Sequence, residues 1–148
     1  MRRSTSSMER VFMSVMKEYN TYGTFDTLYI DNLGDALDGY NKQTTRGGHS
    51  LPQNMTDAEA FEVCLEQKVR LIEMIANEEI ANNVVIRNVT NDNHAGSFGR
   101  CMAVSLKMII NKMYDTKYVE IDNLLRFIEH RVYGDHCFLL THGKDQKN

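Results

Sequence analysis

The sequence predicts an α/β protein in which strands alternate with helices and the chain ends in a β-hairpin. Three observations support this prediction. Apolar runs such as 25–33 and the β-branched run 84–86 end in polar segments, as buried strands do. The segments between them repeat apolar residues at helical spacing. Near the C-terminus, two strand-like segments flank Gly134-Asp135, a pair typical of hairpin turns.

The composition restricts the class of protein. A chain of 148 residues, of which 42% are hydrophobic, fits a single domain, 1–148, with a sizeable core. The net charge of −3 argues against non-specific binding to nucleic acid through overall positive charge. No apolar stretch approaches the length of a membrane span, so we expect no membrane partner. A reducing cytoplasm suits the cysteines, which are odd in number and lack C-x-x-C spacing: Cys64, Cys101 and Cys137.

The first helix is expected after a capping box formed by Ser6 and Glu9. Its polar face is mixed rather than basic, which favours a helix packed on the core over one that binds a membrane. The apolar residues that recur at helical spacing are Val11, Phe12, Val15, Met16 and Tyr19. A loop around Gly23 then leads into the first predicted strand, 25–33.

The first strand ends at Gly34-Asp35, followed by Asp38 and Gly39. Glycine permits a tight turn or the close approach of a ligand, and Asp35 is the first carboxylate beyond the apolar strand. A strand end suits catalytic acids because the sheet fixes the backbone while the loop beyond it stays open. The same residue types form ordinary turns, and the motif alone favours such a turn.

The segment 39–55 is expected to be a long polar loop, and loops of this size bind ligands, act as lids or are mobile. Arg46 precedes two glycines and is a candidate for binding phosphate, since a guanidinium group donates two parallel hydrogen bonds. His49 lies in the same loop and is a second candidate for binding substrate. A solvated loop explains these residues equally well.

A second capping box, Thr56 with Glu59, predicts a helix that Asn82-Asn83 is expected to end. Cys64 is expected in the core because it belongs to the apolar stripe of this helix, formed by Ala60, Phe61, Cys64, Leu65, Val69, Ile72, Ile75 and Ala76. The run 84–86 predicts a buried parallel strand that continues through 87–89.

Polar side chains that bind metals follow this second strand, at Asn93 and His94. Residues 97–114 return to helical spacing, and their methionines are expected to fill the core. Beyond them, 124–132 and 137–140 are predicted to pair as a hairpin whose second strand ends at His142. His130 and His136 are expected to face solvent or lie in this hairpin.

Three predicted strand ends therefore carry polar side chains: Asp35 with Asp38, Asn93 with His94, and His142. The strand ends at one edge of an open α/β sheet converge on a common crevice, so residues distant in sequence become neighbours there. Carboxylate and amide oxygens with an imidazole nitrogen suit divalent cations such as Mn²⁺, Fe²⁺ or Zn²⁺. The sequence thus predicts a metal site at these strand ends.

The order of these motifs resembles the calcineurin-like metallophosphoesterase superfamily, particularly its phage-type members and the nuclease subunits of bacterial DNA repair exonucleases. That family carries Gly-Asp-x-x-Asp, then Gly-Asn-His-Asp/Glu, then a lone His on successive strand ends of a two-sheet αββα sandwich. Residues 34–39 match the first of these motifs. Residues 92–95 match the Asn-His pair, with Asp92 in place of glycine and Ala95 in place of the acid, and 141–143 resemble the lone-His motif.

The resemblance implies hydrolysis of phosphate esters, DNA included, at a dinuclear centre of divalent cations, with Mn²⁺ foremost and Fe²⁺, Zn²⁺ or Mg²⁺ as alternatives. Asp35 would bridge the two cations, and Asn93 and His142 would bind the second. His94 would act at the leaving group, as a general acid or as a hydrogen-bond donor to the transition state. Asp38 would support the site from behind the ligands. The resemblance also implies the cytoplasm of a bacterium or of a phage-infected host.

The family's Asp-x-His and Gly-His-x-His motifs have no counterpart at the expected places, because the only Asp-x-His, 92–94, overlaps the Asn-His motif. The domain is therefore expected to be a partial αββα sandwich, with a completing polypeptide or self-association through open sheet edges as partner. A truncated, non-catalytic remnant or binding module of the same fold is the alternative function.

Overall fold

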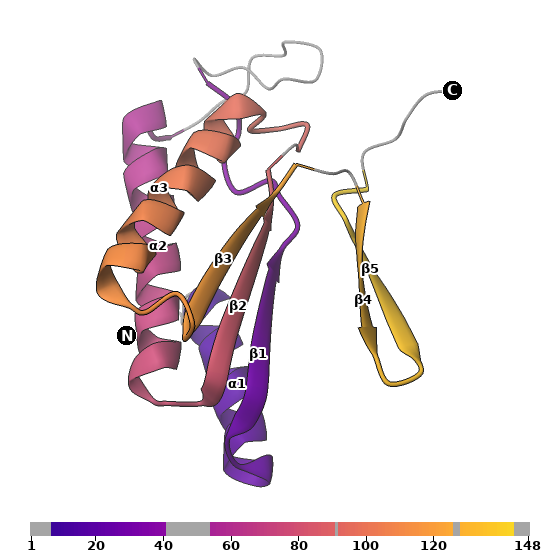
Figure 1. Ribbon diagram of the computed structural model, residues 1–148. Coiled ribbons are helices and arrows are strands. Elements are labelled where there is room, and N and C mark those ends of the chain that lie inside the picture. Colours follow the sequence, from indigo (N-terminus) through magenta and orange to yellow (C-terminus); the bar gives the residue numbers. More distant parts are fainter. Residues whose placement is uncertain (1–6, 41–53, 91, 126–127, 144–148) are drawn as a thin grey trace.

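The computed structural model describes residues 7–40, 54–90, 92–125 and 128–143, and these form a mixed α/β structure with three helices and two sheets. Figure 1 shows the helices on one side of the three-stranded sheet and the hairpin on the other. None of these helices is long and apolar enough to cross a bilayer. The elements are α1 (Ser7–Tyr22), β1 (Phe25–Asn32), α2 (Asp57–Asn77), β2 (Ala81–Val89), α3 (Ser97–Met113), β3 (Val119–Leu124), β4 (Ile128–Tyr133) and β5 (His136–Thr141).

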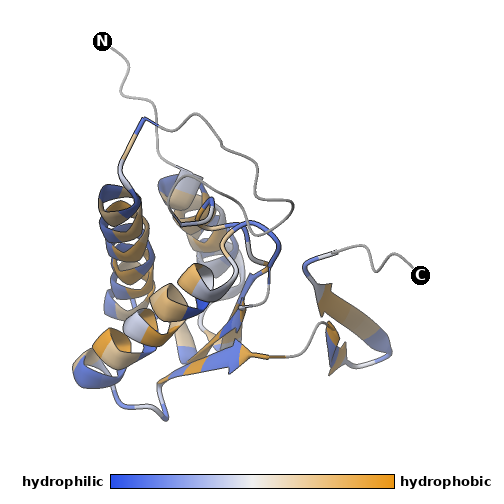
Figure 2. Cartoon of the chain, turned by 90° about the horizontal axis from the view of Figure 1, so that it is seen from above, coloured by the Kyte–Doolittle hydropathy of each residue, from blue (hydrophilic) through white to orange (hydrophobic). Residues whose placement is uncertain are grey.

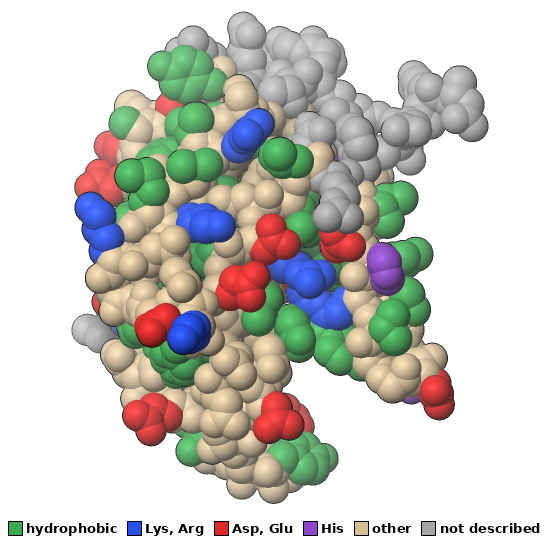
Figure 3. All heavy atoms as spheres, viewed as in Figure 1, with side chains coloured by type: hydrophobic (Ala, Val, Ile, Leu, Met, Phe, Trp, Pro, Cys, Tyr) green, Lys and Arg blue, Asp and Glu red, His purple; other side chains and the backbone are tan. Residues whose placement is uncertain are grey.

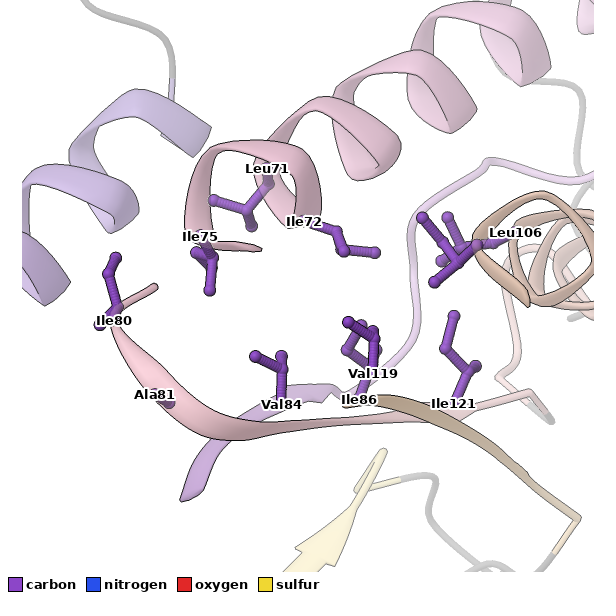
Figure 4. Close-up of a cluster of buried hydrophobic side chains, with 11 residues drawn as sticks. Leu71, Ile72, Ile75, Ile80, Ala81, Val84, Ile86, Leu106, Val119 and Ile121 are labelled. Carbon is purple, nitrogen blue, oxygen red and sulfur yellow. The ribbon is translucent and has the colours of Figure 1, made fainter. Parts of the chain in front are cut away.

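The larger sheet has the order β1-β2-β3, and all its strands are parallel. Parallel neighbours need a crossover connection, which α2 and α3 provide. The helices carry hydrophobic and hydrophilic residues on different sides (Figure 2), as helices that cover one face of a sheet do. Figure 4 shows the buried side chains of α2 and α3 above those of the sheet, and the most deeply buried are Ile75, Ile80, Val84, Leu106, Ile110 and Val119.

The predicted alternation of helices and strands is confirmed, but one strand was missed. Val119–Leu124 forms β3, a parallel strand beside β2, whereas the first hairpin strand was expected to begin at 124 and in fact begins at Ile128. Its residues alternate between apolar and charged, because one face packs on the helices and the other carries Glu120 and Asp122. The predicted turn at Gly134-Asp135 is confirmed, since Tyr133 pairs with His136 across it.

The helix α2 begins as predicted and ends earlier than expected. At its start, Thr56 Oγ1 accepts a hydrogen bond from Glu59 N at 3.3 Å, and Thr56 N donates to Glu59 Oε2 at 2.8 Å, which completes the capping box. The expected end at Asn82-Asn83 is wrong, because both residues lie in β2. The chain turns earlier, where Glu79 has a positive φ of 50°. The first predicted capping residue, Ser6, lies outside the described residues.

The three parallel strands share one short pattern, isoleucine, a charged residue and asparagine, at 30–32, 86–88 and 121–123. The asparagines Asn32, Asn88 and Asn123 lie in register, and we call them the asparagine ladder. Asn32 Nδ2 donates to Asn88 Oδ1 at 3.1 Å, and Asn88 Nδ2 donates to Asn123 Oδ1 at 2.9 Å. The ladder ends where Asn123 Nδ2 donates to the carbonyl oxygen of Ala103 in α3 at 3.1 Å.

The opposite face of the same strands is charged and meets the hairpin through Arg131 of β4. Its guanidinium group is buried, lies 2.9 Å from Asp31 Oδ1 and 2.9 Å from Tyr133 Oη, and stacks 3.7 Å from the ring centre of Tyr29. Figure 3 shows positive side chains in the hollow between the hairpin and the rest of the chain. Arg131 therefore anchors the hairpin to β1.

Replacing the middle asparagine of the ladder should destabilise the fold. Asn88→Ala removes a buried amide and leaves the part-buried amide groups of Asn32 and Asn123 without this partner, so we expect the free energy of unfolding to fall by roughly 2 to 4 kcal/mol. The matched control is Asn83→Ala on the same strand, whose exposed amide donates to the carbonyl oxygen of Asp26 and should change stability by less than about 1 kcal/mol. Urea unfolding measures both, and equal losses would contradict a special role for the ladder.

Candidate metal centre

The structure brings together three of the residues that the sequence suggested as metal ligands. Asp35 follows β1, Asn93 follows β2 and His142 follows β5. His142 Nε2 lies 2.6 Å from Asn93 Oδ1 and 3.3 Å from Asp35 Oδ1. His142 follows the second strand of the hairpin, as predicted, but the hairpin forms a sheet of its own, so the expected convergence at one edge of a single sheet is wrong. The site therefore lies where the two sheets meet.

The hydrogen bonds of His142 indicate what the site can hold. Its Nδ1 lies 2.8 Å from the carbonyl oxygen of Leu33, which can only accept, so Nδ1 carries the proton and donates. In the neutral ring, the lone pair of Nε2 then faces the oxygens of Asp35 and Asn93. A proton or cation between these electron-rich atoms relieves their repulsion, as does an amide of Asn93 turned so that Nδ2 donates to Nε2. A carboxylate, an amide oxygen and an imidazole suit Mn²⁺ and related cations, so the donor set fits a metal.

The exposure of the three side chains differs in a way that matters for substrate. The side chain of His142 is 10% exposed, whereas that of Asp35 is 47% exposed. His142 is thus held in place, and Asp35 faces solvent, where a substrate can reach it. Asp35 also has a positive φ of 53°, a backbone conformation that residues other than glycine adopt rarely and mainly at constrained sites.

Gly34 allows the two sheets to meet closely at this site. With a φ of +103°, it lies where an added Cβ would be 2.7 Å from Asp92 Cβ and 2.8 Å from His142 Nδ1. Gly99 makes similar room in α3, because a Cβ there would lie 3.3 Å from Asp92 Oδ2 and 2.9 Å from Ala95 Cβ. Both glycines are therefore needed for close packing and not only for turning the chain.

Asp92 is a site residue that the sequence analysis had treated only as a departure from a family motif. Its side chain is buried, and Oδ1 accepts hydrogen bonds from the backbone N–H of His94 at 3.0 Å and of Ala95 at 2.6 Å. These bonds fix the turn that carries Asn93 and His94. An aspartate directly before a turn is a recognisable signal, since such side chains commonly accept from the backbone two and three residues ahead.

His94 and Asp38 form a pair beside the three converging side chains. His94 Nδ1 lies 2.8 Å from Asp38 Oδ1. This hydrogen bond is the main reason that the pKa of His94 is raised, and the charges of Asp35, Asp38 and Asp92 add to the effect against a smaller opposing effect of burial. The protonated imidazole is favoured, which suits a proton donor. Asp38 therefore contacts His94, the expected catalytic residue, and its supporting role behind the metal ligands stays a prediction.

A small cavity of about 10 Å³ is lined among others by Gly34, Lys68, Asn88 and Asp92. A cavity of this size holds one water molecule. Burial lowers the pKa of Lys68. Lys68 and the Asp92 turn thus line the same cavity.

The described residues account for only part of the predicted site. Arg46 and His49 lie outside the described residues. Across the described ranges, no group of three or more His, Cys, Asp or Glu side chains could hold a metal ion. The cluster at His142 supplies one carboxylate and one imidazole, with Asn93 as its third donor. These residues would provide only part of the coordination of one cation.

Filling the space at Gly34 should disturb the site. Gly34→Ala adds both an unfavourable positive φ and a Cβ too close to Asp92 and His142, so we expect a loss of roughly 2 to 5 kcal/mol in the free energy of unfolding. The control is Gly23→Ala, which also has a positive φ, of 82°, but would meet nothing within 4 Å. Thermal and urea unfolding measure the difference, and similar losses in both variants would argue against close packing at Gly34.

The charge of Asp38 should control the titration of His94. Asp38→Asn removes the main cause of the raised pKa, so the pKa of His94 should fall in the metal-free protein, as measured by NMR titration. Because the folded pKa is raised, the pair stabilises the fold below the pKa of the unfolded chain. This contribution is lost as the pH rises through the folded pKa. Glu120→Gln on the exposed face of β3 serves as control, and an unchanged pKa in Asp38→Asn would contradict the assignment.

The chain was also compared with known proteins. No protein-family model, no curated protein and no solved structure matches it. We therefore base the functional proposal on the residues and contacts described above.

Proposed function

We propose that the chain is a metal-dependent phosphoesterase, which hydrolyses phosphate monoesters or diesters, with DNA among the candidate substrates. The observation that carries this proposal is the convergence of Asp35, Asn93 and His142 next to the pair of His94 and Asp38. The structure has three layers: the helices, the parallel sheet and, on the other face of that sheet, the hairpin (Figure 1). In the proposed metallophosphoesterase fold, these would be three layers of a partial αββα sandwich.

The proposed metal ligands are Asp35, Asn93 and His142, with Mn²⁺ as the first candidate and Fe²⁺, Zn²⁺ or Mg²⁺ as alternatives. A bound divalent cation would polarise a phosphoryl oxygen and provide a nucleophilic hydroxide at neutral pH. The carbonyl oxygen of Leu33 orients the ring of His142, as partners behind metal-binding histidines generally do. Asp35 has two carboxylate oxygens, and its exposure leaves it available to bridge to a second cation.

His94 is the proposed catalytic residue. The turn held by Asp92 fixes its backbone, and the contact of Asp38 with Nδ1 leaves the Nε2 proton free to face substrate. Since the raised pKa favours the protonated ring, Nε2 is suited to give a proton to the oxygen of the leaving alcohol or a hydrogen bond to a phosphoryl oxygen. The exposed side chain of His94 makes this contact accessible.

The alternative is a non-catalytic remnant or binding module of the same fold. It is favoured by the incomplete ligand set of the described residues. In the described part of the larger sheet, β1 and β3 each pair on one side, so a completing polypeptide or a second copy is the partner that we propose for either function. A reducing cytoplasm is the proposed location, because the cysteines Cys64, Cys101 and Cys137 are free.

Manganese titration tests the proposed ligands. We expect the wild-type chain to bind Mn²⁺ in isothermal titration calorimetry, and Asp35→Ala to bind at least about tenfold more weakly because a ligand is lost. The rates at which Asp35→Ala hydrolyses bis-p-nitrophenyl phosphate and DNA should fall together with its affinity for Mn²⁺. Asp26→Ala, at the other end of β1, is exposed and serves as the matched control that should leave both unchanged.

The outcomes separate the two functions. Manganese binding with hydrolysis no greater than that of Asp35→Ala, even with a supplied partner fragment, would favour the binding module. Two bound cations with hydrolysis that depends on Asp35 would exclude it. No binding of any of the four cations would overturn the metal site.

A further inference from the structure

We infer that a pocket beside His94 and Asp38 binds the nucleobase of a nucleotide phosphate ester. This inference rests on the proposed function and specifies its substrate class. The pocket has a volume of about 300 Å³ and lies between the loop 36–39, the first half of α2 and the start of α3. We call it the Phe98 pocket, and the lining residues used in the argument are Asp38, Met55, Ala60, Val63, Cys64 and Phe98.

The Phe98 pocket adjoins the proposed catalytic group through one shared residue. Asp38 lines the pocket, and its Oδ1 lies 2.8 Å from His94 Nδ1. The neighbouring Asp35, only three residues earlier, contacts His142. When the phosphate of a nucleotide lies at Asp35 and His94, its nucleobase can therefore enter this pocket.

The lining favours a flat aromatic ring. Phe98 lines the pocket and contacts two other rings, with its centre 5.3 Å from that of Phe61 and 5.5 Å from that of Tyr40. A ring held by such contacts can pack against a further aromatic group, which prefers offset or edge-to-face contact. The thioether of Met55 also makes favourable contacts with rings. Met55 and Val63 are both exposed, so this apolar surface is open to a ligand.

Size and charge restrict the ligand further. A pocket of about 300 Å³ is at the small end of ligand sites, so it suits one base and not a longer segment. Burial raises the pKa of the Cys64 thiol, and the carboxylates of this lining are Asp38 and Asp57. A carboxylate disfavours a phosphate in the pocket itself. The neutral base therefore fits the pocket, and the phosphate fits outside it.

Binding of phosphate-free nucleosides to the metal-free, full-length chain tests this inference. We expect adenosine and thymidine, but not ribose, to shift the NMR signals of the methyl groups of Met55, Ala60 and Val63 through ring currents. Val63→Trp should fill the pocket and weaken nucleoside binding at least tenfold. Its matched control is Val104→Trp, because Val63 is 38% exposed on α2 and Val104 is 44% exposed on α3. Circular dichroism of both variants verifies folding.

The results distinguish failure of the pocket from failure of the enzyme. Equal shifts with ribose and adenosine, or equal affinities in the two tryptophan variants, would overturn the base site even if manganese-dependent hydrolysis is found. Nucleoside binding that Val63→Trp abolishes would support the base site even if no hydrolysis is found. If Val63→Trp does not fold, Val63→Met fills part of the same space and should weaken binding by a smaller factor.

Discussion

The hydrogen-bonded asparagine ladder is the constraint on which the arrangement of the site depends. The buried amide of Asn88 must find partners, and it finds them in the part-buried asparagines of the two neighbouring strands, the second of which also bonds to α3. The ladder therefore holds the carboxyl ends of three strands level with one another. Its first member also accepts from Gly34 N at 3.4 Å, so it extends to the turn that carries Asp35. One hydrogen-bonded network thus fixes both the register of the sheet and the position of the turn that carries Asp35.

Much of the fold and part of the site follow from local sequence signals. The alternating helices and strands, the capping box at Thr56 and the hairpin turn are set by neighbouring residues, so short patterns identify them. The convergence of Asp35, Asn93 and His142 was also expected from polar residues at strand ends, although His142 reaches the cluster from the separate hairpin and not from the edge of the parallel sheet.

Other features depend on contacts between distant residues and were missed. Val119–Leu124 carries charges on one face, and only its position beside β2 makes it a strand. The side chain of Asp92 fits only because Gly34 and Gly99 leave space for it, and a local sequence pattern does not show that these residues lie next to Asp92. The Ile-x-Asn repeat was visible in the sequence, but its meaning requires the register that places the three asparagines in contact.

The origin of His142 in the hairpin has a thermodynamic consequence. Asp35 and Asn93 belong to loops of the parallel sheet, whereas His142 belongs to a layer held to that sheet by Arg131. Any ion that contacts all three binds only when the layers are docked. By linkage, such an ion stabilises the docked state by RT ln(1 + [L]/Kd), and a contact that strengthens docking tightens ion binding by the same free energy. The same coupling free energy can therefore be measured as a change in ion affinity or as a change in the stability of the docked layers.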